Sequence, residues 1–236
     1  MATLTALPWS QPSRVDLVAL ARQAGVRRKR VLLRPIEASR GAEKSYEAAL
    51  LALIRQAADH VRSDILPAVI AEQRLSLGDA AAADAIGDRF REIMAGFRAL
   101  LAKLTGIAEG MAGRIFKAEA GRHTDRFAAS VKAAIGIDMS AVLSASDIAD
   151  PLSIRTAENA RLIRSLAEDV ASRVERAVLQ NYRDGGTAKQ LAKTLTGEFG
   201  FPQRRAKLIA RDQTAKLASD LNEIRQRNAG IEKYDW

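Results

Sequence analysis

The sequence predicts an all-α protein, an elongated bundle of long antiparallel helices with an extended N-terminal arm and minimal β-structure. Three observations lead to this prediction. Apolar residues recur at three- and four-residue steps along most of the 236 residues, as on one face of a helix. Aromatic residues make up only 5% of the chain and Ala is abundant, so the expected core consists of small aliphatic side chains between close-packed helices. Capping boxes and glycine stops separate the periodic stretches.

Composition excludes several classes of protein. The chain has no Cys, which rules out disulfides and thiolate metal sites and fits a reducing compartment. No apolar run approaches the roughly 18 residues that a membrane span needs. The first residues carry no basic region ahead of an apolar stretch, so a secretory signal is not expected.

The net charge of +9 is concentrated at the two ends of the chain. Residues 1–40 hold eight Arg or Lys and two Asp or Glu, and residues 187–236 hold ten and six. The middle is balanced, with nineteen basic and twenty acidic residues. Basic ends suit contact with nucleic acid or with an acidic protein surface, and they equally suit a solvated, solubilising surface.

Residues 1–38 are predicted to form a basic, partly extended arm. Its basic run consists of Arg27, Arg28, Lys29 and Arg30. Three prolines and little periodicity argue against helix in this region. Residues 31–36 are expected to be a short strand or a docked extended segment, because the residue before a proline is biased away from helix.

Residues 39–140 are predicted to form an N-terminal long-helix part. A helix over about 41–73 contains Pro67, which should kink or end it nearby. The next helix shows a heptad-type seam from Ile86 to Leu104, with Asp79 as its expected N-cap and Gly106 as its expected end. A third helix, over about 108–135, carries an apolar stripe that Arg122 and His123 interrupt.

Residues 141–155 are predicted to be a connector, and residues 156–236 a C-terminal helical part. Capping signals set the expected starts of its helices: Thr156 for the first, the capping box Ser165–Glu168 for the second and the capping box Thr187–Gln190 for the third. A Gly-Phe-Pro turn should then lead into a long final helix that Gly230 closes.

No catalytic, cofactor-binding or metal-binding residue is predicted, and the expected protein is not an enzyme. His60 and His123 are isolated from one another and have no Cys partners for a zinc site. The sequence lacks a nucleophile elbow, a P-loop and a dinucleotide fingerprint. Gly185-Gly186 is expected to be a tight turn between helices, and nothing fixes the separation of Asp138 and Asp147 in the connector.

The tentative contact residues for nucleic acid or a partner protein, besides the basic run of the arm, are Arg204, Arg205, Lys207 and Arg211. The short helix, the turn and the basic helix after it resemble a helix-turn-helix, whose second helix would enter the major groove. A helix-turn-helix DNA-binding regulator is therefore the alternative function. Asp212, Gln213 and Thr214 are expected to form a structural polar cluster, in which Gln213 and Thr214 could bridge to neighbouring helices.

The order of residues near the C-terminus carries a family resemblance. The stretches Ala206–Thr214, Leu221–Gln226 and Gly230–Trp236 resemble the phage head morphogenesis family, the Mu F-like minor head proteins of tailed phages. Upstream, Val31–Ile36, Gly136–Asp138 and Glu158–Ile163 also look like the Mu-type branch. The resemblance spans roughly residues 31–236 and is most specific at its C-terminal end.

This resemblance implies a minor structural and assembly protein of a phage head that is associated with the portal vertex. It would act in head morphogenesis and in DNA packaging or ejection, with no cofactor. The implied partners are portal protein, major capsid or scaffolding protein, and packaged DNA, with no membrane. The implied location is the virion, and the host cytoplasm during assembly.

The aromatic residues Tyr234 and Trp236 would be an anchor, or the start of a further segment. In the family an Arg-rich, His-containing segment usually follows this aromatic tail, and the present sequence ends at Trp236. A third interpretation, beside the head protein and the regulator, is an enzyme whose catalytic part lies beyond Trp236.

Overall fold

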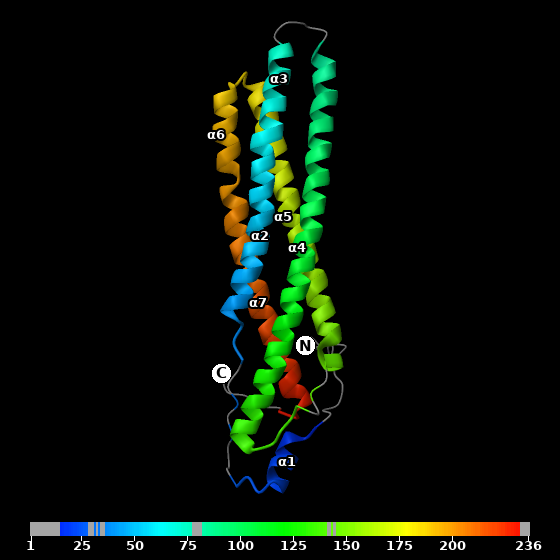
Figure 1. The fold of residues 1–236 in the computed structure, drawn as a ribbon, viewed down its shortest axis with the longest axis vertical. Helices are drawn as coiled ribbons and strands as arrows, with labels where there is room; N and C mark the ends of the chain where they lie inside the picture. The colour runs from blue at the N-terminus through cyan, green and yellow to red at the C-terminus, as the bar shows by residue number, and fades with distance from the viewer. Residues whose placement is uncertain are drawn as a thin grey trace, which may run out of the picture. The chain divides into compact units, whose positions relative to one another are not determined.

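The computed structural model describes residues 15–27, 31, 33, 36–76, 82–140, 143 and 145–231, and this part of the chain is all-α, as predicted, without a strand. The helices along the chain are α1 (Leu17–Gln23), α2 (Arg40–His60), a π-helical turn η1 (Val61–Ile65), α3 (Leu66–Ser76), α4 (Ala82–Ile135), a 3-10 turn η2 (Ala145–Ile148), α5 (Ala149–Arg183), α6 (Ala188–Glu198) and α7 (Gly200–Asn228) (Figure 1). None of the described helices combines the length and apolarity that a membrane crossing requires.

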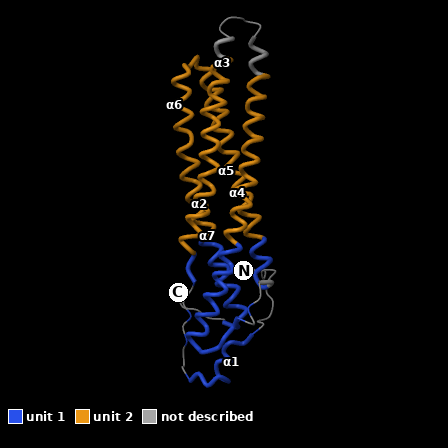
Figure 2. Tube along the Cα trace, viewed as in Figure 1, with its two compact units in different colours: residues 1–38, 117–153, 215–236 blue, residues 39–116, 154–214 orange. Residues whose placement is uncertain are grey.

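The contacts divide the chain into two compact units, each built from separate stretches of sequence (Figure 2). Unit 1 comprises residues 1–38, 117–153 and 215–236, and unit 2 comprises residues 39–116 and 154–214. The long helices α4, α5 and α7 each contribute to both units. This grouping differs from the predicted domains, which follow one another along the chain.

Unit 2 is an antiparallel arrangement of helical columns, as the sequence predicted. The α2–α3 column, residues 82–116 of α4, residues 154–183 of α5, and α6 with the start of α7 run alternately in opposite directions (Figure 1). Aromatic and aliphatic side chains fill the space between them. The ring of Tyr46 meets that of Phe116 edge-on at a centroid distance of 5.7 Å, and its hydroxyl donates to Asn159 Oδ1 at 2.5 Å. Both Tyr46 and Asn159 are buried, so this hydrogen bond lies inside the core.

Pro67 interrupts the first long helix of unit 2 through a wide π-helical turn. Proline lacks an N–H, and its ring crowds the carbonyl four residues earlier, so an α-helical turn cannot close there without strain. The chain forms the turn Val61–Ile65 immediately before it, and α3 then continues through Pro67. Val61 and Ile65 are almost fully buried. The kink predicted near Pro67 therefore takes the form of one wide turn.

The glycine stop predicted at Gly106 is wrong, because α4 continues through it from Ala82 to Ile135. An interior glycine costs a helix roughly 1 kcal/mol relative to Ala, which side-chain packing can offset. On either side of Gly106 the helix buries Phe97, Leu101, Leu104, Ala108 and Ala112. The N-cap predicted at Asp79 lies outside the described residues.

The helix starts predicted at Thr156 and Ser165 are also wrong. Both residues lie inside α5, which begins at Ala149 and runs unbroken to Arg183. The last residues of the predicted connector are therefore helical, including Pro151, which fits a first helical turn because its missing N–H has no partner there. The buried stripe of α5, from Asn159 to Asn181, holds the helix together across the internal capping signals.

The turn after α5 follows the prediction, and the turn after α6 does not. Gly185 has a φ of +61°, and Thr187 and Gln190 form the predicted capping box at the start of α6. Only Phe199 separates α6 from α7, and Gly200, Phe201 and Pro202 form the first turn of α7. Because the first N–H groups of a helix have no internal acceptor, Pro202 is tolerated there. The two helices run on in the same direction (Figure 1), so the predicted Gly-Phe-Pro turn is absent.

Unit 1 has its own small apolar core, built from segments far apart in the sequence. Leu17, Ile36, Phe127, Val131, Met139 and Ala229 form its buried centre. The backbone N–H groups of Val15 and Leu17 donate to the carbonyls of Asn228 and Ala229, which lie at the end of α7. Gly230 closes α7 as predicted, with a φ of +70°. Part of the predicted extended arm is helical, because Asp16 caps the short helix α1.

Candidate functional site

The basic residues predicted on the final helix divide into exposed and half-buried members. Arg204, Lys207 and Arg211 lie on the surface of α7. Arg205 is half-buried, because its guanidinium donates to Ser165 Oγ at 2.8 Å and lies 3.8 Å from the carboxylate of Asp169. Arg205 therefore ties α7 to α5, and the other three predicted contact residues remain on the surface.

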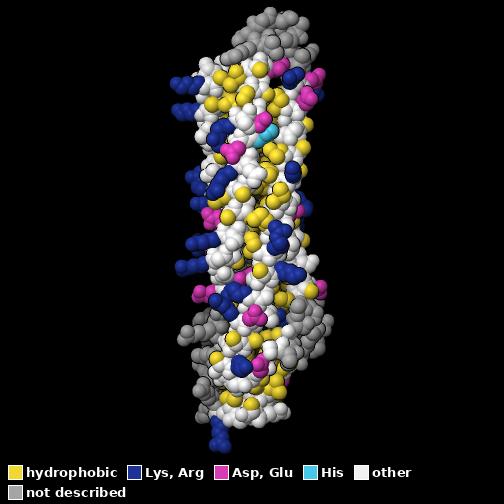
Figure 3. Space-filling view, in the orientation of Figure 1, with side chains coloured by type: hydrophobic (Ala, Val, Ile, Leu, Met, Phe, Trp, Pro, Cys, Tyr) yellow, Lys and Arg dark blue, Asp and Glu magenta, His cyan; other side chains and the backbone are white. Residues whose placement is uncertain are grey.

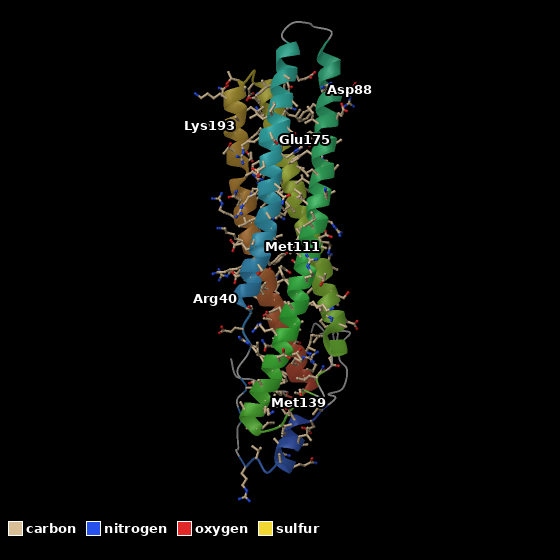
Figure 4. The ribbon with its side chains drawn as sticks, viewed as in Figure 1. Arg40, Asp88, Met111, Met139, Glu175 and Lys193 are labelled. Atoms are coloured by element: carbon tan, nitrogen blue, oxygen red, sulfur yellow. The ribbon has the colours of Figure 1, made fainter. Side chains whose placement is uncertain are left out.

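Two lysines of α6 extend this exposed set. Lys189 and Lys193 are exposed and lie at helical spacing before Arg204, Lys207 and Arg211. We call these five residues the α6–α7 basic row. Lys193, labelled in Figure 4, lies on α6, and Lys and Arg side chains project along the same edge in Figure 3. Sequence spacing did not connect the two lysines with the final helix, because the predicted Gly-Phe-Pro turn would separate the two helices.

The basic row has few acidic partners within the chain. Lys207 Nζ lies 3.9 Å from Glu47, a distance at the limit of an ion pair. Among the described residues, Arg204 and Arg211 have no carboxylate within ion-pair distance. The side chain of Leu208, next to Lys207, is 65% exposed. This surface therefore combines unpaired positive charge with an exposed apolar side chain.

The predicted polar cluster forms hydrogen bonds within α7 and not the expected bridges to neighbouring helices. Gln213 and Thr214 are buried, whereas Arg211 and Asp212 are exposed. The Thr214 hydroxyl donates to the carbonyl of Ala210 at 2.8 Å, and the Gln213 amide donates to Asp212 at 2.9 Å. These bonds remain within α7, so the predicted bridges to neighbouring helices are not what holds these side chains.

Unit 1 contains a buried cluster of charged groups that the sequence did not predict. Arg225 is completely buried, with its Nη1 atom 3.3 Å from Asp147 Oδ2 and its Nη2 atom donating to Thr124 Oγ1 at 2.8 Å. Burial lowers the pKa of Arg225, and the neighbouring carboxylate of Asp147 opposes that shift. A signal was present, since Arg225 follows Leu221 at helical spacing on the apolar stripe of α7. Its partners lie 78 and 101 residues away in the sequence, so spacing alone could not identify them.

The second half of this cluster surrounds His123. Arg122 pairs with the buried Glu119 and donates to the backbone carbonyl of Glu37 at 2.9 Å. The hydrogen bond with Glu119 raises the pKa of Arg122. His123 is completely buried, and burial lowers its pKa to about 4, although the side chain of Asn222 acts in the opposite direction. With this lowered pKa, the enclosed imidazole is neutral at pH 7.

Asn222 connects this cluster to the N-terminal segment. Its side-chain amide donates to the carbonyl of Ile36 at 2.9 Å and accepts from the N–H of Ile36 at 3.0 Å. One side chain thus satisfies both backbone groups of a residue 186 positions away. Of the two alternatives for residues 31–36, a docked extended segment agrees with the structure at Ile36.

The remaining predicted residues are placed as follows. Arg27 is exposed, whereas Arg28, Lys29, Arg30, Tyr234 and Trp236 lie outside the described residues. His60 stacks on Phe97 and lies 2.9 Å from Asp64. The two carboxylates of the predicted connector have different cationic partners: Asp138 pairs with Lys132, and Asp147 pairs with Arg225. No group of His, Cys, Asp or Glu in the described part of the chain has the arrangement of a metal site.

Comparison with known proteins finds a sequence similar to this chain. An uncharacterized protein of Haemophilus influenzae is 32% identical over 165 residues, which cover 64% of this chain and 37% of the relative. The chain thus spans little more than a third of the relative that it matches. No protein-family profile matches the sequence, and no solved structure is significantly similar to it.

Proposed function

We propose that this chain is a minor structural and assembly protein of a tailed-phage head, associated with the portal vertex and acting in head morphogenesis and DNA packaging or ejection. The order of residues in Ala206–Thr214, Leu221–Gln226 and Gly230–Trp236 supports the proposal through its family resemblance. Its location would be the virion, and the host cytoplasm during assembly.

The observation that carries the proposal on the structural side is the α6–α7 basic row. Five exposed cations lie at helical spacing on two helices that run on in one direction. A row of this kind suits a long acidic surface, and we propose that this surface belongs to the portal ring. Packaged DNA, major capsid protein and scaffolding protein are further partners that would meet the same charges.

The helix-turn-helix alternative gains no support from the geometry. Such a motif needs two helices that cross at roughly 90 to 120° around a turn. Here Gly200, Phe201 and Pro202 are helical, and α6 leads directly into α7. A recognition helix would therefore not stand out from the helix before it.

Co-sedimentation with portal protein tests the proposal. The chain is co-expressed with the portal protein encoded in the same phage genome, and the complex is separated on a glycerol gradient. We expect the chain in the portal fractions, and a triple variant Lys193→Glu/Arg204→Glu/Arg211→Glu should move to the free fractions. A matched variant, Lys117→Glu/Arg126→Glu/Arg176→Glu, changes three other exposed cations and should stay bound.

Purified particles give the decisive result. Mass spectrometry of intact virions should detect the chain in few copies. If virions and portal complexes both lack it, the proposal is wrong. If the chain instead binds a short DNA duplex of defined sequence much more tightly than a scrambled duplex at the same salt concentration, a regulator is the better interpretation.

A further inference from the structure

Among the residues that the structure describes, the buried groups that can carry a charge below pH 7 all lie in unit 1. Glu119, His123 and Arg225 are at most 3% exposed, and the carboxylate of Asp147, which faces Arg225, is equally enclosed. The buried polar side chains described in unit 2 are neutral amides and hydroxyls: Tyr46, Thr105, Asn159, Asn181, Gln213 and Thr214. Because charge is costly to bury, acid should act on unit 1 before it acts on unit 2.

His123 is enclosed between groups from two helices. Arg122 and Glu119 face it from α4, and Arg225 and Asn222 face it from α7. Burial lowers the pKa of His123 most, and the positive charges of Arg225 and Arg122 lower it further, whereas the Asn222 side chain and Glu119 raise it. The imidazole therefore takes up a proton less readily in this site than it would in water.

A proton on His123 would leave the cluster with one positive charge in excess. Glu119 pairs with Arg122, and Asp147 pairs with Arg225, so each carboxylate already has a guanidinium beside it. A charge that is enclosed without a counter-ion is among the costliest groups that a folded protein can hold. The protonated cluster should therefore favour any rearrangement that admits water.

The side chains around His123 also hold the N-terminal segment, by which we mean the described residues of 15–38. Asn222 bonds both backbone groups of Ile36, at 2.9 and 3.0 Å. Arg122 donates to the carbonyl of Glu37 at 2.9 Å. The N-terminal segment thus lies against the same two side chains that face the imidazole, and it forms part of the enclosure.

The N-terminal segment is the part of unit 1 that can leave without breaking a helix. It lies wholly within unit 1, whereas α4 and α7 continue into unit 2 (Figure 2). The connector between α4 and α5 is held by a helix at each end. Besides its contacts near Ile36, the segment is fixed by two backbone hydrogen bonds, from Val15 and Leu17 to the end of α7, and by its side chains in the small apolar core.

We propose that acid detaches the N-terminal segment from unit 1 while unit 2 stays folded, with protonation of His123 as the trigger. Departure of the segment opens the cluster, so that water can solvate the imidazolium. Local opening of this kind needs less free energy than unfolding of the whole chain. This proposal does not rest on the phage-head function.

Hydrogen exchange of the full chain, read by mass spectrometry, tests the proposal. The pKa of His123 is about 4 when it is enclosed, against 6.5 for an ordinary histidine, so the open form is increasingly favoured as the pH falls between these values. The protection factors of peptides that contain Leu17 and Ile36, corrected for the intrinsic exchange rate at each pH, should fall roughly 50-fold between pH 7 and pH 4.5. At pH 4.5, residues 163–178 of α5 should remain protected after the N-terminal segment has exchanged completely. Exchange of both regions in step would mean that acid unfolds the whole chain, which overturns the proposal.

Two variants identify the trigger. His123→Gln removes the titrating group and keeps a polar side chain, so the N-terminal segment should keep its protection at pH 4.5. His60→Gln is the matched control, because it removes the chain's other histidine, which belongs to unit 2, and its segment should open in acid as in wild type. If His123→Gln opens in acid to the same extent as wild type, another group is the trigger and the proposal is wrong.

The pH profile of the wild type answers the same question if His123→Gln does not fold. Release that depends on a histidine should already lower the protection of the N-terminal segment roughly 20-fold by pH 5. Carboxylates ordinarily have a pKa near 4, so release that depends on them would begin only below about pH 5. Protection that stays constant from pH 7 to pH 5 therefore overturns the proposal.

Discussion

The guanidinium of Arg225 lies 3.3 Å from the carboxylate of Asp147, and both side chains are excluded from water. Removing one member of such a pair leaves the other charge buried and uncompensated. Asp147→Ala should therefore lower the free energy of unfolding by about 3 to 5 kcal/mol. The double variant Arg225→Met/Asp147→Leu should cost less than Asp147→Ala alone. Urea denaturation of the three proteins measures both effects, and a double variant less stable than the single one would contradict this account.

The amide of Asn222 holds the backbone of Ile36 through two hydrogen bonds. Asn222→Ala should leave these buried backbone groups without partners and lower the free energy of unfolding by about 1 to 3 kcal/mol. The amide of Ile36 should also exchange its hydrogen faster than in the wild type. Exchange rates measured by mass spectrometry would show this, with the amides of α5 in unit 2 as the internal reference.

His123 should make the protein less stable in weak acid. Its pKa is about 4 in the folded state against 6.5 for an ordinary histidine. Between these values the unfolded chain binds a proton that the folded protein does not, so this contribution to stability is complete above pH 6.5 and is lost as the pH falls toward 4. The full loss amounts to about 3 kcal/mol. Denaturation between pH 7 and pH 4.5 should show a steeper decline for wild type than for His123→Gln.

Tyr46 donates a short hydrogen bond to Asn159 in the core of unit 2. Tyr46→Phe keeps the ring that packs on Phe116 but leaves the Asn159 carbonyl without its donor, so we expect a loss of about 1 to 2 kcal/mol. Burial raises the pKa of Tyr46 above the ordinary value of 10.0. The unfolded chain therefore ionises first in alkali, and stability should fall as the pH rises above 10.0 more steeply in wild type than in Tyr46→Phe. Denaturation at pH 9 and pH 11 measures the difference.

Local signals in the sequence correctly predicted helix ends at positions where a few neighbouring residues set the backbone conformation. Gly230 and the Thr187–Gln190 capping box are examples, since a left-handed glycine and a reciprocal side-chain bond act within a few residues. The same kinds of signal failed at Gly106 and Ser165. There the buried stripes of α4 and α5 continue on both sides, and their packing outweighs a weak local preference for ending the helix.

The candidate sites show the same limit. Arg204, Lys207 and Arg211 could be predicted because a basic face follows from helical spacing alone. The pairing of Arg225 with Asp147, and of Asn222 with Ile36, could not, because each joins segments far apart in the sequence. Sequence spacing showed that Arg122 and His123 interrupt an apolar stripe. It did not show that His123 and Glu119 are enclosed.

The π-helical turn before Pro67 has a consequence for how this helix tolerates insertions and deletions. Ala57, Val61, Ile65 and Val69 are all buried, at a constant spacing of four residues. In an α-helix each residue advances by about 100°, so a repeat of four drifts steadily around the axis. The wide turn absorbs one extra residue and keeps the four side chains on one face. A one-residue deletion within Val61–Ile65 should therefore keep the later buried residues in phase, at the cost of strain between Pro67 and the carbonyl four residues before it. The same deletion near Leu53 would rotate every core residue between it and the wide turn away from its partners.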